Sequence, residues 1–454
     1  MIYDLIIIGG GPAGYHAAER AGHNGLKTAL FEKKNIGGVC LNEGCIPSKT
    51  LLYSAKLFDN AKTGEKYGLS VENARLDHKK VIERKNRVVR TLVTGIRSAL
   101  KKNNVEIFQT EASVKGFSDG VFEIAGGEDL FYAKKILLAT GSSPVIPPIK
   151  GIDEGIKNRK VLTSADIFSL ETIPEKMVII GAGIIGLEMA SYFNSLGSKV
   201  TVMEMTGSVA GNLDKDLASV LIGNYKKKGV DFKFDAKVTE IGSDHVDFSS
   251  GDADNEIEAD LVLVCTGRTP NTNGLGLENI GLKTEKGFIK TDEFCMTGIP
   301  GVYAAGDVNG NSMLAHTAYR EAEVCINNIQ GIDDRMDYRY IPSVIYTNPE
   351  IAVVGESEDS CEQKGIEYDV VKVPLRFSGR YLAENEMGDG ICKMLVDKQK
   401  RIAGFHMIGN YSSEMIYGLS MMMQNEMKTA DILKTVFPHP TVSEIIKEGI
   451  FHLG

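Results

Sequence analysis

The first regular pattern along the chain is a short apolar run that ends in glycines and leads into an alanine-rich stretch. Residues 4–33 begin with Asp4 and the apolar LIII, pass through GGGPAG and an Ala-rich segment, and reach a second apolar run. A short apolar run bounded by glycine predicts a buried strand, and the longer segment after it predicts a helix. Residues 176–205 repeat this order. We therefore expect two strand–turn–helix–strand units of the kind found in parallel α/β sheets.

Both units carry glycines in G-x-G-x-x-G register, and in both an acid lies 23 residues beyond the first glycine (9 to 32 and 181 to 204). The residues are Gly9, Gly11, Gly14 and Glu32 in the first unit and Gly181, Gly183, Gly186 and Glu204 in the second. In such a motif the first glycine permits a tight turn, the second lets the backbone approach a pyrophosphate, and the third packs helix on strand. The acid accepts hydrogen bonds from ribose hydroxyls. The sequence predicts two dinucleotide sites, one filled permanently and one exchanging.

Three further segments support an α/β fold. Residues 134–144 and 259–270 resemble each other, since each has an apolar strand, a Thr-Gly pair and a closing proline. Residues 301–310 contain a strand that ends near Asp307, whose carboxylate could reach a sugar or ribityl hydroxyl. From Arg335 onward, alternating apolar and polar residues predict an antiparallel sheet with helices. We expect two Rossmann-like dinucleotide-binding domains and a separate α+β C-terminal domain.

Composition narrows the class of protein. The 454 residues suggest about three domains, and 43% hydrophobic with 24% charged residues is typical of a globular protein. The net charge of −9, with no long Lys/Arg run, argues against nucleic acid or a membrane as partner. The N-terminus has no basic segment, and no stretch approaches about 18 apolar residues. We expect a cytoplasmic protein, in a compartment where disulfides are rare unless catalytic.

Cys40 and Cys45 are a close pair among seven cysteines, in the segment GGVCLNEGCIPSK (37–49). Three chemistries would bring two cysteines so near: a metal site, a structural disulfide or a redox pair. A structural zinc site usually needs four ligands, commonly as two close pairs, and the sequence has no second pair. A disulfide across so short a loop would constrain the unfolded chain little. The other five cysteines lie far apart in the sequence and are expected to be buried thiols.

Taken together, the motifs resemble the flavoprotein pyridine nucleotide–disulfide oxidoreductases, and among them the dihydrolipoamide dehydrogenases. The similarity covers essentially the whole chain and includes GGGPAG, GGVCLNEGCIPSK, ATG, GAGIIGLEMA, the TGR turn, AAGD, LAHTAYREA, YTNPE and HPTVSE. The resemblance implies a homodimer. It also implies an FAD-binding segment (1–147), an NAD-binding segment (148–270), a central FAD-binding segment (271–340) and an interface (dimerisation) domain (341–454).

The resemblance also implies roles for individual residues. It places a reversible disulfide between Cys40 and Cys45, and it places Lys49 near the flavin in a pair with Glu188. No metal is implied. The residues implied for FAD are Gly9, Gly11, Gly14, Glu32, Lys49, Thr140, Gly141 and Asp307, and those for NAD are Gly181, Gly183, Gly186, Glu204, Gly267 and Arg268.

The segment FPHPTVSE resembles the part of the family that carries a catalytic base. His439 precedes a proline and is held in an extended conformation. Glu444 could accept a hydrogen bond from the second ring N–H and so raise the basicity of the imidazole. In the family this pair serves the disulfide of the neighbouring subunit, and the peptide bond before the proline is commonly cis. His316, in LAHTAYREA, is expected either to pack near the flavin or to act chemically.

The implied activity is oxidation of protein-bound dihydrolipoamide by NAD+. The implied partner is a lipoylated carrier protein of a 2-oxo acid dehydrogenase or glycine-metabolising complex. Glu204 would repel the 2′-phosphate of NADP, and residues 205–208 offer no basic side chain to bind it, which favours NAD. The alternatives are an NADH-dependent reductase of another disulfide and a non-catalytic subunit that scaffolds a complex. Residues 374–385 depart from the family pattern, with Arg380 as the candidate for its arginine.

Overall fold

The first apolar run forms β1 (Ile2–Ile8), a central strand of a seven-stranded sheet in the computed structural model, which describes residues 1–211 and 213–453. The strand order is β3-β2-β1-β6-β5-β4, and β17 also pairs with β6. The other strands are β2 (Thr28–Phe31), β3 (Glu106–Phe108), β4 (Ala112–Ser118), β5 (Val121–Gly126), β6 (Asp129–Leu138) and β17 (Val302–Ala304). Because β17 runs parallel to the end of β6, it brings Asp307 to the same edge of the sheet as Thr140.

The second apolar run forms β9 (Lys176–Ile180) in a parallel five-stranded sheet of order β11-β10-β9-β15-β8. Its other strands are β8 (Val161–Thr163), β10 (Lys199–Met203), β11 (Asp231–Lys233) and β15 (Leu261–Val264). An antiparallel sheet follows β11 and contains β12 (Ala236–Ile241), β13 (His245–Ser250) and β14 (Ala253–Glu258). Strands β7 (Ser142–Pro144) and β16 (Arg268–Pro270) pair antiparallel, which joins the two similar Thr-Gly segments.

The helices of the two nucleotide folds begin where the glycine turns end. In the first fold, α1 (Pro12–His23) has a proline at its first position, where a missing N–H leaves no bond unmade. The remaining helices before the C-terminal unit are α2 (Gly38–Glu43), α3 (Cys45–Lys62), α4 (His78–Lys102), α5 (Ile152–Lys157), α6 (Ile184–Ser195), α7 (Lys215–Lys227) and α8 (Ala315–Ile329). In the second fold, α6 follows the second glycine turn in the way that α1 follows the first. Helix α3 packs on both α4 and α6, so it connects the first fold to the second.

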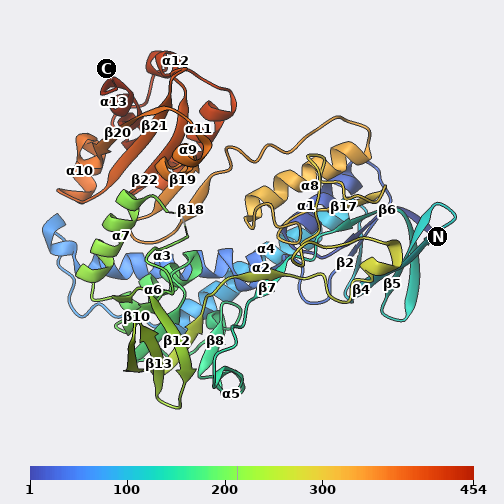
Figure 1. Cartoon of the computed structure of the whole chain (residues 1–454), viewed down its shortest axis with the longest axis horizontal. Helices are drawn as coiled ribbons and strands as arrows, with labels where there is room; N and C mark the ends of the chain where they lie inside the picture. Colours follow the sequence, from blue (N-terminus) through green and yellow to red (C-terminus); the bar gives the residue numbers. More distant parts are fainter. Residues whose placement is uncertain (212, 454) are drawn as a thin grey trace.

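The C-terminal residues form the antiparallel sheet that the alternating pattern predicts, with order β18-β19-β22-β21-β20. Figure 1 shows this unit, in orange and red, above the second nucleotide fold, in green, with the first fold at the right. Its elements are β18 (Ser343–Ile345), β19 (Ile351–Gly355), β20 (Tyr368–Pro374), β21 (Ile391–Asp397), β22 (Ile402–Ile408), α9 (Glu358–Lys364), α10 (Gly379–Asn385), α11 (Ser412–Gln424), α12 (Thr429–Lys434) and α13 (Ile445–Phe451). The predicted fold class is confirmed. Among the described residues, no helix combines the length and apolarity needed to cross a bilayer.

A buried lysine fastens the C-terminal sheet to the second nucleotide fold. Lys393, on β21, is fully buried and contacts Asp214 (2.6 Å), Asp216 (2.8 Å) and Glu358. Burial alone would lower the pKa of Lys393, but its hydrogen bonds to these carboxylates outweigh burial and raise the pKa. The ammonium therefore stays charged. Asp214 also caps the N-terminus of α7, so the same carboxylate holds both the helix and the sheet.

We expect Lys393→Met to lower the free energy of unfolding by about 3 kcal/mol, because the substitution leaves Asp214 buried without its cation. Urea denaturation followed by circular dichroism measures the change. Lys372→Met is the matched control, since Lys372 also contacts Asp216 (2.7 Å) but has a half-exposed side chain. The control should lose less than about 1 kcal/mol. Equal losses in the two variants would show that burial of Lys393 is not what matters.

Candidate active site

Two glycines bring the cysteine pair against the first dinucleotide turn. Gly37 and Gly38 have φ angles of 101° and 57°, in the left-handed region, and they start helix α2, which carries Cys40. A Cβ on Gly38 would lie 2.6 Å from Cα of Gly11, so a side chain there would push α2 away from the turn. Cys45 is the first residue of α3. The site thus depends on close backbone contact between two glycine segments.

The two thiols are half-buried and free. The hydrogen bond from Cys40 and the positive charge of Lys49 lower the pKa of Cys45 to about 7. The bond to Cys45, together with burial, raises the pKa of Cys40. In the reduced pair, Cys45 is therefore the sulfur that carries negative charge near neutral pH.

Lys49 and Glu188 meet across the contact between the two nucleotide folds. Lys49 Nζ lies 3.0 Å from Oε1 and 3.1 Å from Oε2 of Glu188. Glu188 is on α6, two residues after the last glycine of its motif, and its side chain is only 3% exposed. A carboxylate buried to this extent needs a cation, and α3 supplies it one helical turn after Cys45. The predicted pair is present in the structure.

The first dinucleotide turn has the form that the glycine motif predicts. A Cβ on Gly14 would lie 1.8 Å from the carbonyl oxygen of Gly9, so helix and strand could not pack with any other residue there. At Gly11 a Cβ would meet only Cα of Gly38, at an ordinary contact distance of 3.9 Å. Glu32 accepts hydrogen bonds from the backbone N–H groups of Gly10 (2.7 Å) and Lys34 (2.6 Å). This turn has room for a phosphate against bare backbone.

The second turn has the same construction. A Cβ on Gly186 would lie 2.2 Å from the carbonyl oxygen of Gly181, whereas a Cβ on Gly183 would have no heavy atom within 3.8 Å. Glu204 accepts from the backbone N–H groups of Ala182 (3.0 Å) and Thr206 (2.9 Å). The two acids thus occupy equivalent positions at the ends of β2 and β10.

The remaining predicted cofactor residues gather near the β7–β16 pair. Thr140 donates to the carbonyl of Asn271 (2.7 Å), and Gly141 and Gly267 have φ angles of 68° and 122°. Arg268, predicted with NAD, donates to Oγ (2.6 Å) and to the carbonyl (2.6 Å) of Ser142.

Arg268 also lies 3.7 Å from Asp307. Its side chain therefore turns toward residues of the first fold, and its predicted contact with NAD stays a prediction. Sequence analysis missed Ser142, which also donates to Asp307.

The predicted base pair is formed within the C-terminal unit. His439 Nδ1 lies 2.9 Å from Oε1 of Glu444, and Glu444 also accepts from the N–H of Thr441 at 2.9 Å. The bond from Thr441 and then the contact with His439 lower the pKa of Glu444. The peptide bond between His439 and Pro440 is cis. The side chain of His439 is 78% exposed. Within one chain, this pair faces solvent.

One buried polar group near the site has no sequence motif that marks it. Glu321, on α8, is fully buried and accepts from the N–H of Gly306 (2.6 Å), Asn309 Nδ2 (2.9 Å) and the hydroxyl of Tyr338 (2.7 Å). It thus holds the turn that carries Asp307. Burial raises the pKa of Glu321. No local sequence signal distinguishes Glu321 from ordinary helix surface. On the same helix, the exposed His316 bonds the carbonyl of Pro342 (2.8 Å), and its expected role near the flavin or in the chemistry stays a prediction.

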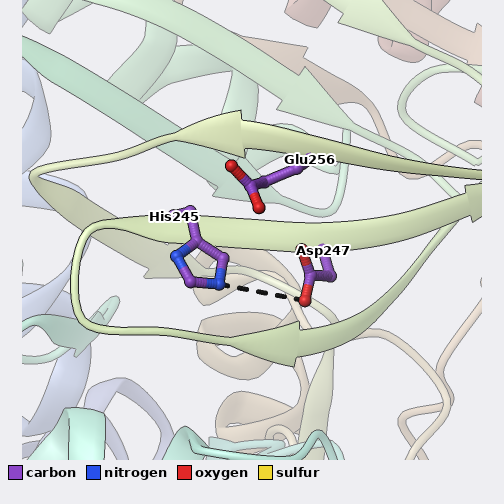
Figure 2. A group of neighbouring side chains, drawn as sticks. All are labelled: His245, Asp247 and Glu256. Atoms are coloured by element: carbon purple, nitrogen blue, oxygen red, sulfur yellow. Dashed lines mark ion pairs between the residues drawn. The ribbon is translucent and has the colours of Figure 1, made fainter.

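Among the described residues, two groups of possible metal ligands lie outside the predicted site. One consists of Asp214, Asp216 and Glu358, whose carboxylates already bind the Lys393 ammonium. The other lies on the antiparallel sheet of β12–β14. His245 and Asp247 lie two residues apart on β13, and Asp247 is directly opposite Glu256 on β14. Figure 2 shows the three side chains, with His245 Nε2 3.9 Å from Asp247. Glu256 is exposed, His245 and Asp247 are half-buried, and the group includes none of the predicted cofactor or cysteine residues. We assign no metal to it, and the absence of a metal stays a prediction.

Comparison with known proteins gives matches over nearly the whole chain. Residues 3–322 match the pyridine nucleotide-disulphide oxidoreductase family, and residues 341–450 match the dimerisation domain of the same enzymes. The mitochondrial dihydrolipoyl dehydrogenase of Pisum sativum is 37% identical over 98% of this chain and 90% of its own. The dihydrolipoyl dehydrogenase of Geobacillus stearothermophilus is 38% identical over 98% of this chain and 95% of its own. The structure of RclA, an HOCl-induced flavoprotein disulfide reductase from Escherichia coli, has a TM-score of 0.87 at 28% identity over 99% of both chains.

The pKa of Cys45 predicts a thiolate that appears in the reduced protein with a midpoint near pH 7, and whose amount rises with pH. Ultraviolet thiolate absorbance measures it, as the difference between the wild type and Cys45→Ser. Lys49→Met should move the midpoint upward, because the lost charge stabilised the thiolate. Lys56→Met, which removes a lysine on the same helix α3, is the control and should leave the midpoint unchanged. A midpoint near the ordinary thiol value in the wild type would contradict this account.

Proposed function

The chain belongs to the pyridine nucleotide-disulphide oxidoreductase family, and from this premise we propose that it oxidises protein-bound dihydrolipoamide to lipoamide while reducing NAD+ to NADH. The observation that most supports this proposal is the His439–Glu444 pair, in which His439 Nδ1 lies 2.9 Å from Oε1 of Glu444 and the histidine faces solvent. A thiol substrate must lose its proton before it can attack a disulfide, and this pair supplies a base for that step.

FAD and NAD(H) are the cofactors of this family, and the chain is a flavin-dependent NAD oxidoreductase that acts on sulfur groups. The first turn would hold FAD, with Glu32 toward its ribose, and Asp307 would hold a further hydroxyl of the cofactor. The second turn would hold NAD, with Glu204 toward its ribose. The chemistry that a bound flavin supplies is to accept two electrons from the dithiol and to transfer them as a hydride to NAD+. Lys49 would face the negative charge that this transfer places on the ring.

The cysteines and the histidine would carry out thiol–disulfide exchange. His439 takes the proton of one substrate thiol, and the thiolate attacks the sulfur of Cys40, so that a mixed disulfide forms and the Cys40–Cys45 bond breaks. Cys45 leaves as the thiolate that its low pKa favours. The second substrate thiolate then attacks the substrate sulfur of the mixed disulfide, releases cyclic lipoamide and leaves Cys40 reduced. One disulfide has formed in the substrate and one has been reduced in the protein.

The base is expected to act in trans. The match to a dimerisation domain indicates a homodimer. Because His439 faces solvent within one chain, we propose that it serves the Cys40–Cys45 pair of the partner subunit. We also propose the division into FAD-binding (1–147 and 271–340), NAD-binding (148–270) and interface (341–454) segments. The remaining proposals are a lipoylated carrier protein as partner and a cytoplasmic location.

The second candidate is an NADH-dependent reductase of a different disulfide. It is favoured by the similarity to the Escherichia coli disulfide reductase, which covers both chains almost completely. The same residues would run the same exchange in the opposite direction. The two candidates differ in which thiol or disulfide reaches Cys40.

The deciding measurement is NADH formation when the FAD-loaded protein is mixed with dihydrolipoamide and NAD+. We expect absorbance of NADH to grow with dihydrolipoamide, and NADP+ to be a far poorer acceptor because Glu204 repels its 2′-phosphate. If the flavin is bound and no NADH forms, the dihydrolipoamide proposal is wrong. NADH oxidation with other disulfides then tests the second candidate.

We expect His439→Ala to reduce turnover about a hundredfold to ten-thousandfold, since the substitution removes general-base catalysis. FAD content should not change, because the hydrogen bonds of His439 are to Glu444 within the C-terminal unit and not to the dinucleotide turns. His23→Ala is the control, as His23 is an exposed histidine at the end of α1. Near-normal turnover in His439→Ala would remove this residue from the mechanism.

A further inference from the structure

Tyr346 contacts both members of the Lys49–Glu188 pair. The Lys49 ammonium lies 4.4 Å from the centroid of the Tyr346 ring, within the range of a cation–π interaction. The backbone N–H of Tyr346 donates to Oε1 of Glu188 at 3.1 Å. Tyr346 follows directly after β18 in the C-terminal unit. Three separate parts of the chain, carrying α3, α6 and β18, therefore meet at one ion pair.

The contacts of the Lys49 ammonium show what the Tyr346 ring contributes. Lys49 has a long flexible stem with a charge at its end, and Glu188 takes up its hydrogen bonds at 3.0 and 3.1 Å. A further contact to Oγ of Ser48, at 3.5 Å, is weak. The lysine side chain is 33% exposed, so solvent competes for it. The ring covers one side of the ammonium and limits the positions that it can take.

The ring itself is held by a rigid backbone. Ile345 is buried and pairs with Ile351 in the neighbouring strand. Thr347 is also buried, and its hydroxyl donates to the carbonyl of Pro349 at 2.6 Å. Among the described residues, the Tyr346 hydroxyl has no hydrogen-bond partner. The features that matter at this position are thus the aromatic face and the backbone N–H.

We infer that Tyr346 is a positioning residue: its ring and its N–H fix the Lys49–Glu188 pair, and the C-terminal unit thereby sets the charge next to Cys45 and the flavin. The inference rests on the proposed function only for the presence of the flavin and the redox cysteines, and it does not depend on which thiol is the substrate. Because the N–H belongs to the backbone, substitutions test the ring alone.

The test compares Tyr346→Leu with Tyr346→Phe in the FAD-loaded protein. The readouts are the flavin reduction potential and the midpoint pH of the Cys45 thiolate, neither of which needs dihydrolipoamide. Tyr346→Leu removes the ring and should lower the potential and raise the thiolate midpoint. A cation–π interaction of ordinary strength predicts about a fivefold change in each equilibrium. Tyr346→Phe keeps the ring and should retain both wild-type values.

A double-mutant cycle separates positioning from a general structural effect. In the Lys49→Met background, Tyr346→Leu should change neither the potential nor the thiolate midpoint, because the charge that the ring positions is absent. If Tyr346→Leu shifts the two readouts equally with and without Lys49, the inference is wrong. It is also wrong if Tyr346→Leu has no effect, or if Tyr346→Phe shifts them as much as Tyr346→Leu.

Circular dichroism and FAD content report whether each variant folds. Tyr346→Met replaces Tyr346→Leu if the latter does not fold, since an unbranched apolar side chain fills the space without an aromatic face. If the dihydrolipoamide assay fails but Tyr346→Leu still shifts the flavin potential and the thiolate midpoint, this inference stands and only the proposed substrate is wrong.

Discussion

The site depends on one buried carboxylate, Glu188, whose cation comes from the other nucleotide fold. Glu188 is 3% exposed, and its cation, Lys49, comes from α3 of the first fold. Separating the folds would leave an uncompensated buried charge, which is costly. The ion pair therefore fixes how α3 and α6 pack. Since Cys45 starts α3, the same contact also sets where the reactive sulfur lies relative to both dinucleotide turns.

Glycines provide the second constraint, because they let backbone segments touch. Gly38 lies against Gly11, which brings the cysteine helix onto the first turn, and Gly14 and Gly186 let each helix pack on its own strand. The chain thus uses bare backbone both to make room for phosphate and to place the cysteines beside it. Asp307 is placed differently. Glu321 accepts a hydrogen bond from the N–H of Gly306 and so holds the loop that carries Asp307.

A single chain assembles the residues proposed for electron transfer, but it leaves the proposed base exposed to solvent. Cys45, Lys49 and Glu188 are assembled within the chain, and the positive charge of Lys49 favours a thiolate on Cys45. His439 and Glu444 are paired but face solvent. An exposed base fits the proposed mechanism, in which the second subunit of the homodimer completes the site. In that arrangement the substrate would reach Cys40 between two subunits.

The sequence by itself determined the repeated strand–turn–helix units, the antiparallel C-terminal sheet and the pairing of His439 with Glu444, because these depend on local spacing and on glycine. It also indicated Lys49 and Glu188 as a pair, through a family resemblance. Only the tertiary structure decided the direction of Arg268 and the contacts of Glu321 and Tyr346. These contacts join segments far apart in the chain, and their distances follow from how whole folds pack. No local pattern encodes such a distance.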